Sequence, residues 1–216
     1  MDELYVMQGQ EVEVRKIEEV GDDTVALVIE SPDGFEARPG QFVQVGIETE
    51  DEKTVRHYTI SSPYVADDFE ITVEVDPDGE LSPLLAGYGE GEKVTVDGPY
   101  GRSYLEDEET ATILAGGPGI GPALGIAERV LDNGGDAALV FHGEDPPHKD
   151  RLREIEQSGH VSVVDDTDGL SEAIEKALGE VDGQVFIYGF SDFVDQAVEV
   201  LDELNHDDPR KIERFD

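Results

Sequence analysis

The sequence predicts a chain of the β plus α/β class, in which an antiparallel β-barrel is followed by a parallel-sheet, Rossmann-like domain. The first half consists of short β-rich segments separated by Gly, Pro and Asp, a pattern typical of antiparallel barrels or sandwiches. The second half alternates apolar strand segments with amphipathic helical segments, which favours a parallel sheet with right-handed crossovers. An acidic stretch without periodicity at residues 102–109 separates the two patterns. We therefore expect one domain over residues 1–105 and a second over residues 106–216.

The first domain is expected to contain six strands and one short helix. Ser82 is placed to cap a helix over residues 81–88, with Pro83 at its first position. The expected strands are residues 11–17, 24–30, 41–47, 56–62, 69–75 and 92–98.

The second domain is expected to repeat a strand–helix unit. Its first helix ends at a glycine, a common helix stop. The expected strands are residues 110–117, 137–143, 160–165, 184–189 and 211–215, and the expected helices are residues 123–134, 148–157, 170–179 and 192–205.

The composition is strongly acidic, with 53 Asp plus Glu against 15 Lys plus Arg and a net charge of -38. Such a charge repels itself at low salt, whereas the Debye length is only about 3 Å at 1 M. The acid is spread between regular apolar segments, so we expect a folded protein with an acidic shell, from the salt-rich cytoplasm of an extreme halophile. Nucleic acid and anionic membranes are disfavoured as partners.

Cysteine is absent, which excludes disulfides, thiolate catalysis and a cysteine-ligated iron–sulfur cluster within this chain. The first ten residues lack the features of a signal peptide. No apolar run approaches the roughly 20 residues of a membrane-spanning helix. A soluble cytoplasmic protein without membrane insertion is expected, and no metal site is predicted.

A glycine-rich loop, Gly116-Gly117-Pro118-Gly119, joins an expected strand to an expected helix. Backbone amides in such a loop can approach a phosphate, and the amino end of a helix favours anions. The spacing differs from the standard dinucleotide fingerprint. A tight strand-to-helix turn without a ligand is the alternative.

An arginine inside an expected strand opens the segment Arg56-His57-Tyr58-Thr59. Arg56 suits a ligand phosphate, or else a buried ion pair with one of the many carboxylates. His57 is more typical of a satisfied polar residue than of a catalyst. Tyr58 and Thr59 point to opposite faces of a strand unless the strand bends.

Taken in order along the chain, these motifs resemble the ferredoxin–NADP reductase family. The segment 56–59 matches its flavin motif Arg-any-Tyr-Ser/Thr, and residues 116–122 look like its nucleotide loop. The resemblance covers nearly the whole chain. The further matching segments are 39–43, 79–82, 98–101, 186–189 and 212–215.

The resemblance implies a flavin-binding barrel and a pyridine-nucleotide domain, with roles for individual residues. Arg56 would bind the flavin phosphate, assisted by Ser82 at the helix start. Tyr58 would lie against the isoalloxazine, and Thr59 would offer its hydroxyl to flavin N5, so Tyr58 and Thr59 are the catalytic candidates. Phe215 would cover part of the flavin. The full set of implied cofactor-binding residues is Arg56, His57, Tyr58, Thr59, Gly79, Leu81, Ser82, Gly117, Gly119, Ile120, Tyr188, Gly189 and Phe215.

The implied activity is a flavin-dependent reductase that passes electrons from NADH or NADPH through FAD to a one-electron protein acceptor such as ferredoxin. FAD is preferred to FMN by the resemblance alone. Two residues depart from the family. Pro118 stands where the family usually has Thr or Ser, and Tyr188 stands where it usually has Cys. They motivate an alternative, a flavin-binding electron-transfer subunit that no longer uses a pyridine nucleotide. A fold retained only as a partner interface is a third possibility.

The choice of coenzyme is predicted from acidic residues after two strands of the second domain, where ligands bind in such sheets. A carboxylate bonds a ribose 2′-hydroxyl but repels a 2′-phosphate, which favours NADH. Nearby cations would favour a phosphate instead. The acidic residues are Glu144, Asp145, Asp165 and Asp166, and the cations are Lys149, Arg151 and Arg153.

Overall fold

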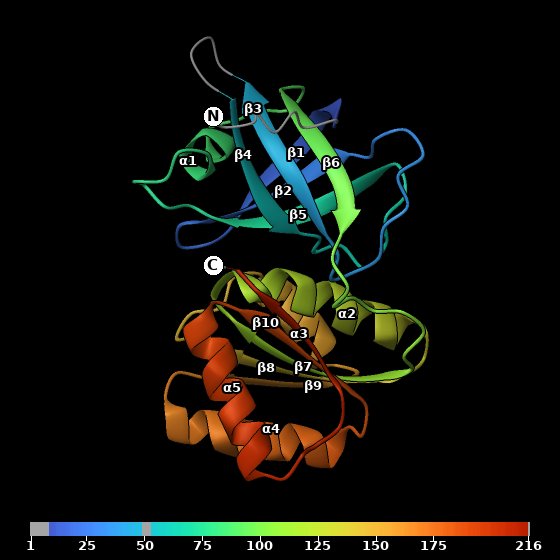
Figure 1. The fold of residues 1–216 in the computed structure, drawn as a ribbon, viewed down its shortest axis with the longest axis vertical. Coiled ribbons are helices and arrows are strands. Elements are labelled where there is room, and N and C mark those ends of the chain that lie inside the picture. Colours follow the sequence, from blue (N-terminus) through green and yellow to red (C-terminus); the bar gives the residue numbers. More distant parts are fainter. Residues whose placement is uncertain (1–8, 49–52, 216) are drawn as a thin grey trace, which may run out of the picture.

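The computed structural model describes residues 9–48 and 53–215 of the chain. Two β-sheets lie one above the other along the longest axis, an antiparallel sheet from the first half and a parallel sheet from the second (Figure 1). The chain end labelled C lies at the junction between them. The predicted fold class is confirmed.

The first sheet has the strand order β4-β3-β6-β1-β2-β5, and all neighbouring strands are antiparallel. A bridge between Ile60, just after β4, and Ile71 on β5 joins the two ends of this order and closes the barrel. The apolar side chains that alternate along the strands fill its interior. The strands are β1 (Gln10–Gly21), β2 (Thr24–Glu30), β3 (Phe42–Glu48), β4 (Lys53–Thr59), β5 (Asp68–Glu74) and β6 (Lys93–Tyr100).

The short barrel helix α1 (Ser82–Ala86) corrects one prediction. Leu81, not Ser82, is the N-cap residue, and it makes no side-chain capping bond. Ser82 is the first helical residue, and its Oγ accepts a hydrogen bond of 3.1 Å from the backbone N–H of Asp76. The serine therefore stabilises the turn before the helix, because its hydroxyl faces back toward Asp76.

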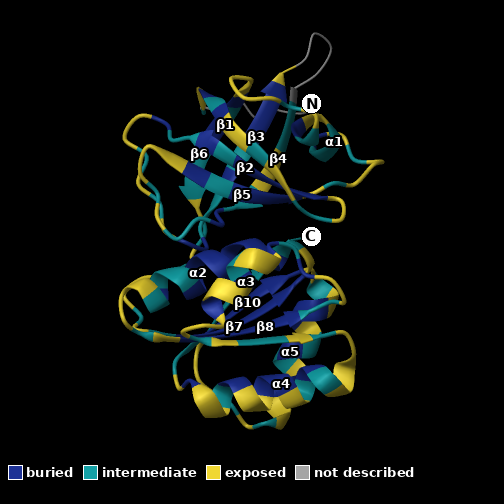
Figure 2. Cartoon of the chain, turned by 180° about the vertical axis from the view of Figure 1, so that it is seen from behind, coloured by how far each residue is buried: buried dark blue, intermediate teal, exposed yellow. Residues whose placement is uncertain are grey.

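The second sheet has the order β11-β10-β7-β8-β9, and every neighbouring pair is parallel. The helices α2 and α3 lie on the face toward the barrel, and α4 and α5 cover the opposite face (Figures 1 and 2). The strands are β7 (Thr110–Gly116), β8 (Asp136–His142), β9 (His160–Val164), β10 (Gln184–Gly189) and β11 (Arg210–Arg214); the helices are α2 (Ile120–Asp132), α3 (Lys149–Ile155), α4 (Thr167–Glu180) and α5 (Ser191–Glu203).

Successive residues of the parallel strands fill two different cores, one on each face of the sheet. On β7, Ile113 packs with α2 and Leu114 packs with α4 and α5. A strand covered on both faces reads as a continuous apolar run, which is why this segment shows no alternation in the sequence.

The acidic residues lie outside these cores. Among the described residues, the buried polar or charged side chains are Thr24, Ser61, Thr72, Thr112 and His148, and none is a carboxylate. Figure 2 shows the exposed residues on the outer faces of α4 and α5 and on loops. In the described part of the chain, no helix has the length and apolarity needed to cross a membrane.

Candidate functional site

A cavity of about 740 Å³ lies at the junction of the two sheets. It opens where β4 ends in the barrel and where β7, β10 and β11 reach their carboxyl ends, the edge at which ligands bind in parallel sheets. Its volume lies within the range of small-molecule sites. The lining residues are Phe42, Arg56, His57, Tyr58, Thr59, Thr72, Glu74, Asp76, Pro118, Phe190, Glu213, Arg214 and Phe215.

Arg56 lies at the barrel side of the cavity and makes an exposed ion pair. Its Nη2 atom is 2.6 Å from Oε2 of Glu80, which directly precedes Leu81 and the start of α1. The ion-pair alternative for Arg56 is therefore observed, but at the surface and not in the interior. An exposed ion pair contributes little to stability, so the guanidinium is available to an incoming phosphate.

Tyr58 and Thr59 both line the cavity although they are consecutive on β4. The strand ends at Thr59, and Ile60 then bridges to β5, so the chain turns at this point. Burial raises the pKa of Tyr58 to about 12, and the charge of Arg56 opposes this only in part. The phenol is protonated at neutral pH and can donate a hydrogen bond into the cavity.

His57 is held by two neighbours on β3. The Nε2 atoms of Gln44 and His57 are 3.2 Å apart, and the His57 ring meets the ring of Phe42 edge-on at 5.3 Å between centroids. These contacts fix the imidazole at the cavity wall, in agreement with its interpretation as a satisfied polar residue.

The glycine-rich loop follows β7 as predicted and forms a single 3-10 turn, Gly117–Gly119, before α2. Gly117 has φ +55°, a backbone conformation that favours glycine. At Gly119, a Cβ would lie 2.1 Å from the carbonyl oxygen of Tyr188. The packing of the loop against β10 therefore requires glycine at 119 whether or not a nucleotide binds. Ile120, the next residue, is fully buried in the core and does not line the cavity.

Tyr188, which the resemblance places among the cofactor-binding residues, does not line the cavity. The side chain is fully buried among the core residues beneath α2, and its hydroxyl donates to the carbonyl oxygen of Ser103. Burial, with the charges of Glu213 and Glu108, raises its pKa well above the usual value. Because the ring points to the α2 face of the sheet, it stabilises the junction and does not line the cavity.

Three further predicted residues, Gly79, Leu81 and Gly189, do not line the cavity. The carbonyl oxygen of Gly189 accepts a 3.1 Å hydrogen bond from the N–H of Phe215 and so positions this aromatic residue at the cavity. The N–H of Gly79 donates to the carbonyl oxygen of Asp76 in the turn before α1. Leu81 belongs to the barrel core.

Seven lining residues were not named as candidates from the sequence: Phe42, Thr72, Glu74, Asp76, Phe190, Glu213 and Arg214. Thr72 and Phe190 carry no signal, because a hydroxyl or apolar residue in or just after a strand is common. Phe42 lies within the matching segment 39–43 but was not singled out. Glu213 could have been noticed as an acid within the predicted last strand. Burial raises the pKa of Glu213, whose carboxylate is partly desolvated at the cavity wall.

The three cations considered for a coenzyme phosphate are all engaged with carboxylates. Arg151 is largely buried and bonded to Glu128 and Glu70, so the prediction that it is available to a phosphate is wrong. Lys149 pairs with Asp145, and Arg153 pairs with Asp150 at 2.6 Å.

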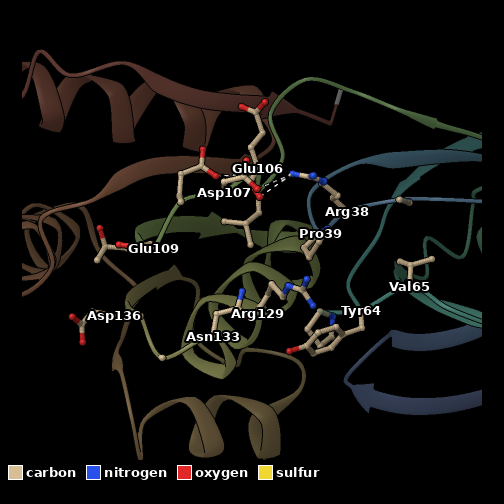
Figure 3. Close-up of a pocket in the computed structure, with 17 residues that line it drawn as sticks. Arg38, Pro39, Tyr64, Val65, Glu106, Asp107, Glu109, Arg129, Asn133 and Asp136 are labelled. Carbon is tan, nitrogen blue, oxygen red and sulfur yellow. Dashed lines mark hydrogen bonds and ion pairs between the residues drawn. The ribbon is translucent and has the colours of Figure 1, made fainter.

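A second cavity, of about 710 Å³, lies at the amino ends of β7 and β8, on the opposite edge of the sheet (Figure 3). The guanidinium of Arg129 lies 4.2 Å from the centre of the Tyr64 ring, and Arg38 bonds the carbonyl oxygen of Glu106. Several carboxylates surround it, and none of the predicted site residues lines it. The first cavity is therefore the candidate site.

The residues of the first cavity fit a flavin nucleotide. Tyr58, Phe190 and Phe215 offer aromatic surface for a planar ring, and Arg56 offers a cation for a phosphate. A protonated phenol and the Thr59 hydroxyl supply the few polar contacts that orient a ligand.

Comparison with known proteins agrees with this fit. Residues 11–104 match the family model described as "Oxidoreductase FAD-binding domain". The glycine betaine monooxygenase reductase subunit of Pseudomonas aeruginosa is 32% identical over 173 residues, which are 74% of this chain and 47% of that protein. The probable dihydroorotate dehydrogenase B (NAD(+)) electron transfer subunit of Methanopyrus kandleri is 27% identical over 200 residues, 88% of this chain and 72% of that protein.

Among solved structures, a ferredoxin NADP+ reductase from Neisseria gonorrhoeae with bound FAD and NADP superposes with a TM-score of 0.78. It is 20% identical, and the match covers 95% of this chain and 97% of that chain. This likeness shows the fold. The chain spans about half the length of the betaine monooxygenase reductase subunit that it matches.

Proposed function

We propose that this chain, which contains a FAD-binding oxidoreductase domain over residues 11–104, is a flavin-dependent reductase that moves electrons from NADH or NADPH through FAD to a one-electron protein acceptor. The supporting observation is the cavity at the junction of the sheets. It brings the segment 56–59 of the barrel against Pro118 of the glycine-rich loop and Phe215 of the last strand. A flavin on the barrel and a nicotinamide on the parallel sheet would meet there. We assign the barrel to residues 1–105 and the nucleotide domain to residues 106–216.

Bound FAD would supply the chemistry, by accepting a hydride from the coenzyme and releasing electrons one at a time. The chain's part is to bind and orient. Arg56 would give up its ion pair with Glu80 and bind the flavin phosphate instead. The hydroxyl of Tyr58 would donate a hydrogen bond to an oxygen of the ribityl chain. Thr59 would place its hydroxyl at N5, and Phe215 would cover part of the ring and exclude water.

The acceptor is proposed from the relatives and not from a surface of this chain. Two of them are named as a monooxygenase reductase subunit and an electron transfer subunit, and both names imply a partner protein. A ferredoxin-like redox protein is the class of acceptor that we infer. The acidic shell favours a setting of high salt, which we take to be a halophile's cytoplasm.

Anaerobic titration tests this function. The purified chain should bind FAD, turn yellow, and lose its flavin absorbance when NADH or NADPH is added at molar KCl. Absence of flavin binding, or bound FAD that neither coenzyme reduces, would contradict the proposal.

One observation favours a second function, electron transfer without a pyridine nucleotide. A Cβ at Gly117 would lie 3.5 Å from the Phe190 ring, so that ring lies over the glycine-rich loop. Bound FAD that dithionite reduces but neither coenzyme reduces would support this function. Phe190→Ala would then be expected to open the loop to nucleotide.

A further inference from the structure

A polar cluster lies between the barrel and the nucleotide domain, behind the candidate site. Its barrel members are Ser61, Glu70 and Thr72, and its members on the other side are His148 and Arg151. We refer to these five residues as the interdomain clamp. Glu128 on α2 also bonds Arg151, but within the nucleotide domain, and is not counted in the clamp. Its position between β5 and the helices α2 and α3 can be followed in Figures 1 and 2.

Arg151 on α3 is the centre of the clamp. Its guanidinium donates to Oε1 of Glu70 on β5 and to the carbonyl oxygen of Ser61, each at 2.7 Å. It also donates twice at 2.7 Å to Glu128 on α2. Arg151 and both carboxylates are only about 20% exposed at their side chains, so solvent and salt screen this pair of ion pairs poorly. Burial opposes the charge, but the two carboxylates raise the pKa of Arg151 above its usual value.

His148 joins the clamp to the candidate site. Its Nε2 lies 2.9 Å from Oγ1 of Thr72, and Thr72 itself lines the cavity. The backbone N–H of His148 donates to the carbonyl oxygen of Val20, also in the barrel. The residue has φ +58°, an uncommon conformation for a non-glycine residue. Burial lowers the pKa of His148 to about 3, and Arg151 adds to this, so the ring is neutral at physiological pH.

The barrel and α2 also approach closely beside the clamp. A Cβ at Gly121 would lie 3.0 Å from Thr72 Oγ1, and one at Gly125 would lie 2.9 Å from the carbonyl oxygen of Ser61. With glycines at these two positions, α2 lies directly on the barrel backbone. The directional bonds of the clamp therefore act across a contact with little space for sliding.

We propose that the interdomain clamp is a positioning device, which fixes the nucleotide domain against the barrel and thereby sets the distance between the coenzyme and the flavin. The inference rests on the proposed function. Hydride transfer needs its two partners within about 0.5 Å of the productive geometry. A misplacement of about 1 Å can cost a factor of about 100. A loosened clamp would slow the transfer without removing either binding site.

The test compares a variant that weakens contacts across the domains with a control within one domain. Glu70→Gln removes the charge that pairs with Arg151 across the domains. It is combined with His148→Asn, which removes the hydrogen bond to Thr72, because asparagine tolerates the left-handed backbone but is too short to reach that hydroxyl. Glu128→Gln is the matched control. It removes an ion pair of equal burial with the same Arg151, but within the nucleotide domain.

The readout is an interdomain distance that needs no cofactor. Because the chain has no cysteine, Glu90→Cys in the barrel and Glu175→Cys on α4, both exposed, can be spin-labelled in every variant. Pulsed electron paramagnetic resonance should give a broader distance distribution for the double variant and an unchanged one for the control.

Stopped-flow reduction of FAD by saturating coenzyme then tests the consequence. The limiting rate should fall by about tenfold or more in the double variant, with FAD content unchanged, and stay within about twofold in the control. An unchanged distance distribution, equal broadening in the control, or broadening without a slower rate would overturn the proposal. If the parent chain binds no FAD, the proposed function fails, while the distance comparison still decides whether the clamp fixes the domains.

Discussion

Arg56 is the residue that we propose for the flavin phosphate. It lies at the cavity, and its partner Glu80 is more exposed than Arg56 itself. Replacing an exposed carboxylate with a bound phosphate strengthens the charge pairing at little cost, because the pair was already solvated.

Arg56→Ala should therefore weaken FAD binding and leave the fold intact. The loss of one charge-assisted hydrogen bond, about 1.5–3 kcal/mol, corresponds to an affinity about 10 to 100 times lower. Flavin content and fluorescence titration measure the effect, and circular dichroism checks the fold. Arg15→Ala is the control, since Arg15 makes exposed ion pairs on β1 away from the cavity. Equal flavin content in both variants would leave Arg56 as an ion-pair partner only.

Glu213 gives a pH-dependent prediction. Its pKa is raised because burial disfavours the carboxylate, so the folded state binds a proton more tightly than the unfolded state. The contribution to stability is complete below the unfolded pKa and is lost as the pH rises through the folded pKa. Glu213→Gln should therefore stabilise the protein at pH 8, and the gain should shrink toward pH 5. Urea unfolding at both pH values in molar KCl measures this, and a gain that grows on acidification would contradict it.

At the scale of elements, the loop between β7 and α2 is set by contact with β10. Gly119 meets the backbone of Tyr188, and this backbone cannot give way because β10 pairs with β7 inside the sheet. This contact holds Pro118 at the cavity wall, so the packing of the loop also shapes the candidate site.

Gly119→Ala should destabilise the fold by more than about 2 kcal/mol, since its Cβ would clash with a backbone carbonyl. Gly179→Ala on α4 is the control, because nothing lies within 4 Å of that Cβ. The control should be stabilised by about 0.4–1 kcal/mol through a less flexible unfolded chain. Chemical denaturation of both variants at the same salt concentration measures their stabilities. Equal denaturation midpoints would contradict the prediction, because they would show that the loop can shift to accommodate the Cβ.

The segments after β8 and β9 govern the coenzyme prediction. Asp145 has Lys149 as a partner, and Asp166 caps α4 by accepting from the N–H of Gly169 at 2.7 Å. Among the described residues, the structure shows neither an ion pair nor a capping hydrogen bond for the other two carboxylates, Glu144 and Asp165. We expect NADH to reduce the flavin faster than NADPH, by tenfold for each 1.4 kcal/mol of charge repulsion, which is about what one badly placed charge supplies. Stopped-flow reduction with each coenzyme in the same KCl measures this, and faster reduction by NADPH would contradict it.

At the scale of the whole molecule, the net charge of -38 and the carboxylate-free described core lead us to predict that folding depends on salt. The Debye length rises from about 3 Å at 1 M to about 30 Å at 0.01 M, so surface carboxylates repel one another across the whole molecule at low salt. The melting temperature should climb with KCl through the molar range. The ion pair between Arg151 and Glu70 should lose less strength as salt rises than exposed pairs do, because these side chains are only about 20% exposed. A melting temperature independent of KCl would remove the argument for a high-salt setting.

Much of the fold follows from the sequence because its signals are local. The change from β-rich segments to strand–helix units reflects the period of each element, and turn residues mark the ends. The acidic shell follows from composition. The segment 56–59, which the sequence singles out, lines the cavity because the chain turns at the end of β4; its flavin contacts stay a prediction.

Only the tertiary structure decided what depends on contacts between distant elements. Tyr188 points to the α2 face of the sheet and not into the cavity, since the register of β10 against β7 fixes which face each residue takes. The sequence made Arg151 a candidate phosphate ligand, whereas in the structure it is the centre of the clamp. The reason is that Glu70, 81 residues earlier, lies against it. Thr72 and Glu213 enter the site for the same reason. Local sequence carries the period of an element, whereas the partner of a side chain is chosen when two elements meet.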